Sequence, residues 1–159
     1  MNDAKHSLAI NALNRIMELE LAGVVKYTHY SLMIFGYNRI PIVSWLKENA
    51  TESLDHAHRA GELVTLLGGH PSLKIGPLLE TERHDIGDIL RESLEHETIA
   101  LVSYYDLLKI AACTHPETNG VQSVMLEEYA REMIVLEEMH LDEVNKMLRK
   151  PGEISPFTA

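Results

Sequence analysis

The sequence contains a single cysteine, Cys113, among its 159 residues. One cysteine cannot form an intrachain disulfide or a multi-cysteine metal site, and it fits the reducing cytoplasm, where we expect this chain to reside. Long apolar runs are absent as well. Every window long enough to cross a bilayer holds several charged residues, so the sequence predicts no membrane span, and its first ten residues lack the apolar run of a secretory signal.

Basic residues are also scarce. Lys and Arg number 14 against 24 Asp and Glu, which gives a formal net charge of −10. This balance disfavours non-specific DNA binding, because that binding needs Lys and Arg against phosphates, and we expect neither a nucleic-acid nor a membrane partner. The composition, 45% hydrophobic and 24% charged, is ordinary for a soluble globular domain of this length.

Four long segments show helical periodicity and are separated by Gly and Pro. Two links are short, while the link from Gly68 to His84 is long and contains Pro71, Gly76 and Pro77. The pattern predicts an all-α, antiparallel four-helix bundle over residues 1–150, with one long crossover between the second and third helices and a short tail over 151–159. The expected helices run over about Asp3–Phe35, Pro41 to Gly68, Asp85–Cys113 and Gly120 to just before Pro151.

Each expected helix carries an apolar stripe at steps of three and four residues, the pattern of an inward face. Each stripe is interrupted by Glu or His, well away from the helix ends. An unpaired buried charge costs several kcal/mol or neutralises itself by a shifted pKa, whereas a bound cation pairs with several carboxylates at once. Carboxylate and imidazole ligands together suit iron, manganese or zinc. The interrupting residues are Glu20, His56, Glu97, Glu137 and His140.

The two helix pairs are also rough copies of each other. Glu20 is followed seven residues later by Tyr27, and Glu97 is followed seven residues later by Tyr104. We expect both tyrosines to pack inside the bundle with their hydroxyls bonded to nearby carboxylates, and no further catalytic residue is assigned. Glu137-x-x-His140 has its counterpart in a Ser-x-x-His motif that ends at His56. In the third helix the expected inward stripe reads Ile86, Leu90, Leu94, Glu97, Leu101, Tyr104 and Leu108.

Alternative explanations exist for each residue taken alone. A Glu on a helix seam more often belongs to a buried ion pair, and a seam His is more often a hydrogen-bonded core residue. What favours a metal centre is the combination, because the residues lie on the inward stripes of all four helices and the arrangement is repeated.

With these motifs the sequence resembles the ferritin-like diiron-carboxylate family, and bacterioferritins most closely, over about Leu8 to Leu148. The resemblance implies a ferritin-like bundle that holds two irons, with Glu20 and Glu97 as terminal ligands and Glu137 as a bridge. It implies that His56 and His140 each hold one metal. It further implies oxidation of ferrous iron by dioxygen or peroxide, a ferroxidase-type activity, for iron storage or detoxification. The matching segments are Glu20-Leu21-Ala22 with Tyr27, His56-Ala57, Leu90-Arg91 through Glu97, and Glu137-Glu138-Met139-His140.

Three departures from that family pattern bear on function. Ser53 stands where the family has a second bridging Glu, and Leu54 stands where bacterioferritins use a Met to ligate haem, so haem is not expected. The segment from Pro151 onward leaves no room for the fifth helix of the 24-subunit cage, so we expect a homodimer. Ferritin-like bundles usually pair along the first two helices, and we expect the outward apolar residues Leu32, Ile42, Val43 and Trp45 to form such a face.

Glu52 is a candidate replacement ligand, because it lies next to Ser53 and shares a helix face with His56, four residues on. A solvated or dimer-face Glu is the alternative for this residue. For the whole chain the alternative is a non-catalytic metal-binding or structural bundle with an incomplete site. The sequence leaves open the physiological metal, the oxidant and whether one or two metals bind.

Overall fold

A computed structural model describes residues 3–78, 81–112 and 121–158 of the chain. Within these ranges there are four helices and no strand: α1 (Asp3–Met33), α2 (Arg39–Leu66), α3 (Ile86–Ala112) and α4 (Val121–Leu148). The predicted all-α four-helix class is confirmed. Helix α1 ends two residues earlier than expected, and α2 begins two residues before Pro41, which therefore lies in its first turn, where proline is tolerated. The expected boundaries at Cys113 and Gly120 lie outside the described residues.

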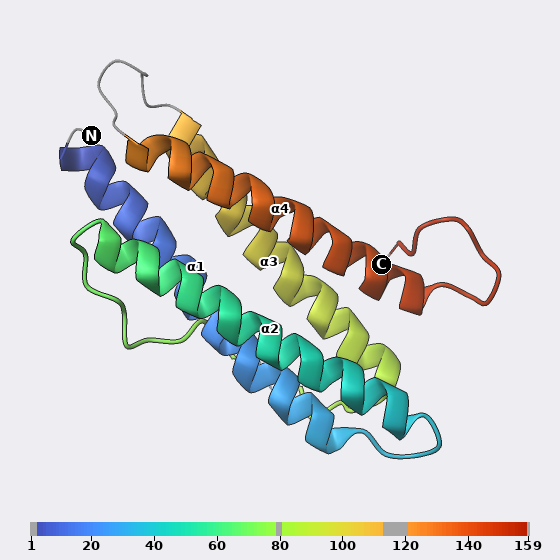
Figure 1. Ribbon diagram of the computed structural model, residues 1–159. Helices are drawn as coiled ribbons and strands as arrows, with labels where there is room; N and C mark the ends of the chain where they lie inside the picture. Colours follow the sequence, from blue (N-terminus) through green and yellow to red (C-terminus); the bar gives the residue numbers. More distant parts are fainter. Residues whose placement is uncertain (1–2, 79–80, 113–120, 159) are drawn as a thin grey trace.

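The four helices form two antiparallel pairs, α1 with α2 and α3 with α4 (Figure 1). Helix α1 packs closely against both α2 and α3, and α3 packs against α4. Among the described residues, however, no Cα atom of α2 lies within 8 Å of one in α4. Side chains must therefore span the space between α2 and α4, and this space is where several candidate ligands point.

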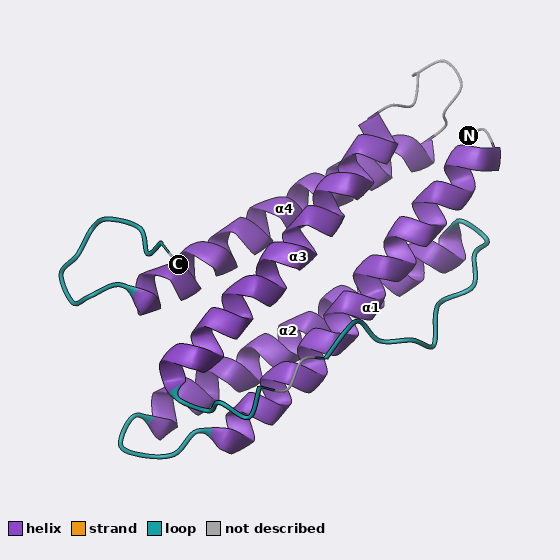
Figure 2. Ribbon diagram, turned by 180° about the vertical axis from the view of Figure 1, so that it is seen from behind, coloured by secondary structure: helices purple, strands orange, loops and turns teal. Residues whose placement is uncertain are grey.

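Residues 68–78, the first described part of the long link between α2 and α3, run along the outside of α1 (Figure 2). The link begins at Gly68, whose φ of +72° ends α2 in the left-handed conformation that glycine adopts without strain. The Gly76 N–H donates to the Glu18 carbonyl over 2.7 Å, and the Ser72 N–H donates to Asn14 Oδ1 over 2.8 Å. The link then meets α3 at Asp85, whose side chain accepts a hydrogen bond from the Gly87 N–H at 3.0 Å and so caps the helix. The link thus fixes α3 against α1.

The core consists of two apolar clusters separated by a layer of polar side chains. The larger cluster joins the N-terminal half of α1 to the C-terminal half of α2 and includes Leu13 and Val64, together with residues of α3 and α4. The smaller cluster, at the other end, joins Tyr27 and Ile34 to Leu46 and Ile89. Carboxylates and imidazoles occupy the layer between them. Buried charge in that layer has apolar packing above and below it.

The structure corrects one expectation about the surface of the first helix pair. Val43 was expected on an outward apolar face, but it is only 9% exposed, and Ile42 and Trp45 pack against the smaller cluster. Leu32 does face outward, at 63% exposure. None of the described helices carries a stretch apolar enough to span a bilayer.

Candidate metal centre

One candidate ligand on each helix is buried in the polar layer. Glu20 of α1, His56 of α2, Glu97 of α3 and Glu137 of α4 are each at most 6% exposed. His140 of α4, one helical turn after Glu137, is a quarter exposed. The residues that interrupted the apolar stripes therefore come together inside the bundle, because each occupies the inward position of its own helix at the same level.

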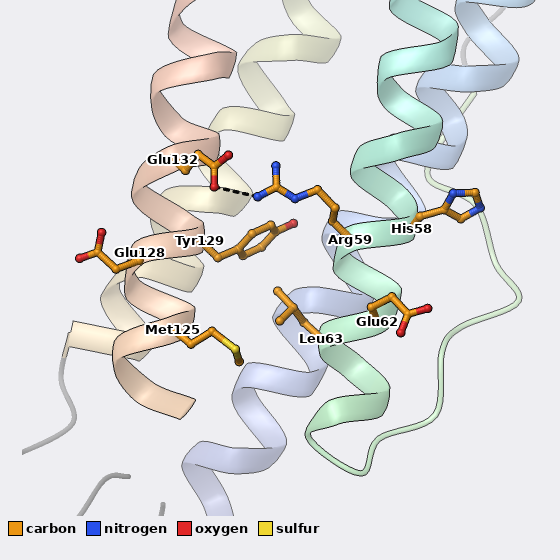
Figure 3. Close-up of a pocket in the computed structure, with 8 residues that line it drawn as sticks. All are labelled: His58, Arg59, Glu62, Leu63, Met125, Glu128, Tyr129 and Glu132. Atoms are coloured by element: carbon orange, nitrogen blue, oxygen red, sulfur yellow. Dashed lines mark hydrogen bonds and ion pairs between the residues drawn. The ribbon is translucent and has the colours of Figure 1, made fainter. Parts of the chain in front are cut away.

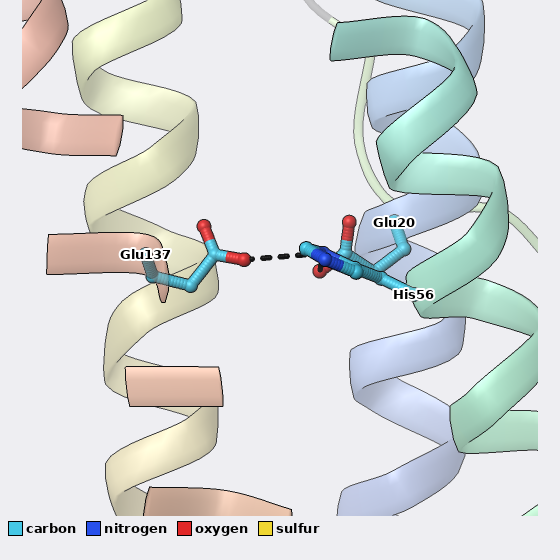
Figure 4. Close-up of side chains that lie close together, drawn as sticks. All are labelled: Glu20, His56 and Glu137. Atoms are coloured by element: carbon cyan, nitrogen blue, oxygen red, sulfur yellow. Dashed lines mark ion pairs between the residues drawn. The ribbon is translucent and has the colours of Figure 1, made fainter. Parts of the chain in front are cut away.

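The first group joins α1, α2 and α4. His56 Nδ1 lies 3.4 Å from Glu20 Oε1 and 3.3 Å from Glu137 Oε1, so one imidazole nitrogen contacts carboxylates from two other helices (Figure 4). The ligand atoms of these three residues all lie within 4.8 Å of one another. Such a spacing is what a single metal ion would need.

The second group joins α3 and α4. One ligand atom each from Glu97, Glu137 and His140 lies within the same 4.8 Å limit. His140 Nδ1 is 3.9 Å from Glu137 Oε2, whereas His56 contacts Oε1 of that carboxylate. Glu137 thus belongs to both groups, with one oxygen directed to each. The imidazole rings of His56 and His140 lie nearly parallel, with their centroids 6.5 Å apart.

Two tyrosines cross the bundle and bond the carboxylates of Glu20 and Glu97. The Tyr104 hydroxyl of α3 donates to Glu20 Oε1 of α1 over 2.7 Å, and the Tyr27 hydroxyl of α1 donates to Glu97 Oε1 of α3. Both tyrosines are fully buried. Each one therefore fixes the carboxylate of the opposite helix pair, the kind of support that orients metal ligands.

Burial and mutual repulsion dominate the electrostatics of the carboxylates. Burial raises the pKa of Glu20 and raises that of Glu97 further, and the neighbouring charge of Glu137 adds to both shifts. Burial would raise the pKa of Glu137 too, but hydrogen bonds with His56 and Glu97 outweigh it and leave that pKa below its ordinary value. Burial alone would lower the pKa of His56, yet its hydrogen bonds to Glu137 and Glu20 raise it to about 10. Without metal, the His56 imidazolium is the cation of the site.

The donor set fits a metal better than it fits a closed network of hydrogen bonds. Glu137 Oε2 is buried and has no hydrogen-bond partner among the described residues. A buried carboxylate oxygen without a partner is costly, and a cation between this oxygen, Glu97 and His140 would remove that cost. Carboxylate oxygen with imidazole nitrogen is a set that iron, manganese and zinc accept.

Comparison with known families identifies the protein class. The ferritin-like domain family matches residues 10–152, which is most of the chain. The chain belongs to the ferritin-like family. Comparison with curated protein sequences gives no match.

Solved structures of ferritin-like proteins share this fold at low sequence identity. A ferritin-like diiron-carboxylate protein from Bacillus anthracis is 20% identical, with a TM-score of 0.82 over 94% of this chain and 100% of that one. A bacterioferritin from Rhodobacter capsulatus with a metal-free dinuclear site is 22% identical, with a TM-score of 0.77 over 89% and 84% of the two chains. A bacterioferritin from Desulfovibrio desulfuricans with a diiron site is 21% identical, with a TM-score of 0.76 over 91% and 80%.

Glu52 reaches the ferritin-like centre from the rim between α2 and α4. Its Oε2 lies 3.1 Å from His140 Nε2, and its Oε1 lies 4.0 Å from His56 Nε2. The side chain is 41% exposed, and it lines a surface pocket together with Glu48 and Glu143. Glu52 therefore contacts both histidines on the side opposite Glu137.

Ser53 lies deeper, in a tightly packed layer beside the centre. A methyl group placed on Gly23 of α1 would come within 2.8 Å of the Ser53 hydroxyl oxygen and 3.1 Å of His96 Nε2. His96 is only 5% exposed, and burial together with the charge of Lys26 lowers its pKa to about 4. The sequence stripe of the third helix missed His96, although its position next to Glu97 was the signal that could have found it.

A separate pocket of about 520 Å³ between α2 and α4 contains none of the candidate ligands (Figure 3). Its walls include an ion pair between Arg59 and Glu132 at 2.7 Å, and the Arg59 guanidinium lies 5.4 Å from the centre of the Tyr129 ring. Tyr129 in turn contacts Tyr104 edge-on. The pocket therefore flanks the centre without forming part of it.

Proposed function

We propose that this ferritin-like chain binds two iron ions and oxidises ferrous to ferric iron, for iron storage or detoxification. The observation that carries the proposal is Glu137, which presents one oxygen to each of two ligand groups inside the bundle. Iron at such a centre supplies the one-electron chemistry needed to reduce dioxygen or peroxide. Haem is not part of the proposal.

The residues of the chain have distinct tasks in this scheme. Glu20 and Glu97 bind as terminal carboxylates, each oriented by a tyrosine hydroxyl from the other helix pair. His56 must lose its proton before it binds a metal, and the incoming positive charge replaces the imidazolium charge. The two apolar clusters keep bulk water away from the ligands.

An alternative function is metal binding without turnover, or a structural bundle with an incomplete site. Ser53 favours this alternative, because a neutral hydroxyl stands in a position where a second bridging carboxylate would balance the repulsion between two cations. Anaerobic titration with ferrous iron, followed by exposure to air, separates the functions. Two irons per chain with fast oxidation support the proposal, one iron with slow oxidation supports metal binding alone, and no iron supports a structural role.

Glu52 is proposed as an additional ligand that offsets the loss at Ser53. Its two oxygens face His140 and His56, so a small side-chain adjustment would let it bind a metal held by either imidazole. We expect Glu52→Ala to lower iron stoichiometry or slow oxidation, while Glu48→Ala, a change at an exposed neighbour one turn away, leaves both unchanged. An unchanged stoichiometry and rate in Glu52→Ala would show that Glu52 is only a solvated carboxylate.

A homodimer paired through the first two helices is also proposed. Val25 and Leu32 of α1 and Leu66 of α2 are large apolar side chains that this chain leaves exposed. Light scattering after gel filtration tests the proposal, and a monomer or an assembly near 24 subunits would contradict it.

A further inference from the structure

We propose that His96 is a metal ligand of this centre, and that its imidazole supplies the donor that Ser53 lacks. The inference rests on the proposed function, because it concerns the same two metals. It adds a third histidine to the two that the motifs predict. The ligand groups that already converge in this structure do not include His96, so its ring must turn inward from its present position when metal binds.

The first argument for this proposal is the position of His96 in the bundle. It precedes Glu97 directly on α3, and its ring contacts Tyr27 edge-on with the centroids 6.4 Å apart. Tyr27 in turn holds the Glu97 carboxyl. His96 Nε2 approaches the bare backbone of Gly23, next to the Ser53 hydroxyl. The imidazole therefore lies in the layer where a carboxylate from position 53 would otherwise reach the metals.

The second argument is the burial of the His96 ring. Its side chain is only 5% exposed, so bulk water has little access to the ring. An imidazole with so little access to water gains from any group that binds its nitrogens. Imidazole nitrogen is a common ligand for iron and zinc. Because carboxylates lie nearby, a metal ion is the group that we expect this imidazole to bind.

The third argument is the space that Gly23 leaves for the side chains of Ser53 and His96. A methyl group there would lie 2.8 Å from Ser53 Oγ, closer than packed atoms come, and 3.1 Å from His96 Nε2, tighter than most packed contacts. The backbone φ of Gly23 is not in the left-handed region, so the glycine is required for space and not for conformation. The small residues at 23 and 53 together make room for the larger imidazole at 96.

His96 also lines a cavity of about 210 Å³ between α1 and α3, with Lys26 and Glu95 on its walls. This cavity lies on the α1–α3 side of the centre, whereas Glu52 approaches from the α2–α4 side. His96 therefore borders open space on the α1–α3 side, the side away from Glu52.

The test uses cobalt(II) as the probe, in the full chain, with two metals added per chain. Ligand imidazoles give strongly shifted N–H proton signals beside paramagnetic cobalt, and unbound histidines do not. We expect three such signals in the native protein and two in His96→Leu. The affinity for the second cobalt should fall by at least roughly tenfold in His96→Leu, in line with losses at supporting groups of metal sites. His58→Leu, a matched change at an exposed histidine of α2, should keep all three signals.

Two shifted imidazole signals in the native protein would overturn the proposal without any variant, while leaving two-metal binding intact. Unchanged cobalt affinity in a folded His96→Leu would overturn it as well. Absence of all shifted signals in the native protein would mean that the proposed function itself has failed, and the His96 proposal with it. As a second variant, Ser53→Glu/His96→Ala should regain the affinity for the second cobalt that His96→Leu loses, because the vacated space then accepts a carboxylate. Failure to regain it would count against a shared position for the two side chains.

Discussion

The two helix pairs of this protein carry almost the same candidate ligands but differ at one matching position. The α3–α4 pair supplies Glu97 with Glu137 and His140, and the α1–α2 pair supplies Glu20 with Ser53 and His56. The pairs are tied crosswise by the two tyrosines, each of which bonds a carboxylate of the other pair. The difference at a single position leaves Glu137 as the only deeply buried carboxylate of the described residues that both ligand groups share.

The largest expected effect is at that shared carboxylate. Glu137→Gln should abolish binding of the second metal and weaken the first beyond the roughly 10- to 100-fold typical of lost supporting groups, because both ligand groups lose an anionic oxygen. Ser53→Ala, at the matching position of the other pair, should change metal affinity little. Isothermal titration with cobalt(II) measures both. Equal losses in the two variants would show that the pairs do not differ as described.

Next in size is the response of stability to metal and pH. Metal at about 100 times its dissociation constant should stabilise the fold by about 2.7 kcal/mol. At about 2–4 °C per kcal/mol for a chain of this size, the melting temperature should rise by roughly 5–11 °C. Thermal unfolding with and without zinc at pH 7 measures this shift, and an unchanged melting temperature would contradict the metal centre.

The dependence of folding stability on pH should differ between the metal-free and the metal-bound protein. The pKa of His56 rises on folding from 6.5 to about 10, so its contribution to the stability of the metal-free protein is complete below pH 6.5 and is lost as the pH rises towards 10. The raised pKa of Glu97 acts in the same direction. Metal binding needs both groups deprotonated, so the shift caused by metal should grow between pH 6 and 8.5. A shift that shrinks over that range would contradict the assigned proton positions.

A smaller effect is expected at the crosswise tyrosines. Tyr27→Phe and Tyr104→Phe should each lower metal affinity by about tenfold, because each removes one hydrogen bond that orients a terminal carboxylate. Tyr105→Phe removes a hydrogen bond to Glu138 on the surface and serves as the control. Unequal losses at Tyr27 and Tyr104 would reveal which helix pair holds its metal more rigidly.

The smallest effect is expected for the ion pair that joins α2 and α4, the two helices that are set apart from each other. The Arg59–Glu132 pair is half exposed there, so Glu132→Gln should cost less than about 1 kcal/mol of stability and leave metal affinity unchanged. Denaturant unfolding measures the cost. A larger loss would mean that this pair, and not the buried ligands, joins the second and fourth helices.

The sequence by itself determined the four helices and most of the candidate ligands. Periodicity placed Glu20, His56, Glu97 and Glu137 on inward faces, and they are buried together, because an α-helix repeats its faces at fixed residue spacings. The family resemblance on those residues is confirmed by the ferritin-like domain match. Their roles as ligands, and that of Glu52, stay predictions.

Only the tertiary structure decided which residues outside the predicted inward stripes are buried. On α3, Ile89, Ser93 and His96 are buried, while Leu94 and Leu101, assigned to the stripe, are only partly so. A third helix that contacts α1 on one side and α4 on another buries more than one narrow stripe, and no single-helix pattern contains that information. The close approach of His96 to Gly23 and Ser53 depends on three helices at once. It follows from how α1, α2 and α3 are packed, which residue spacing along one chain segment cannot encode.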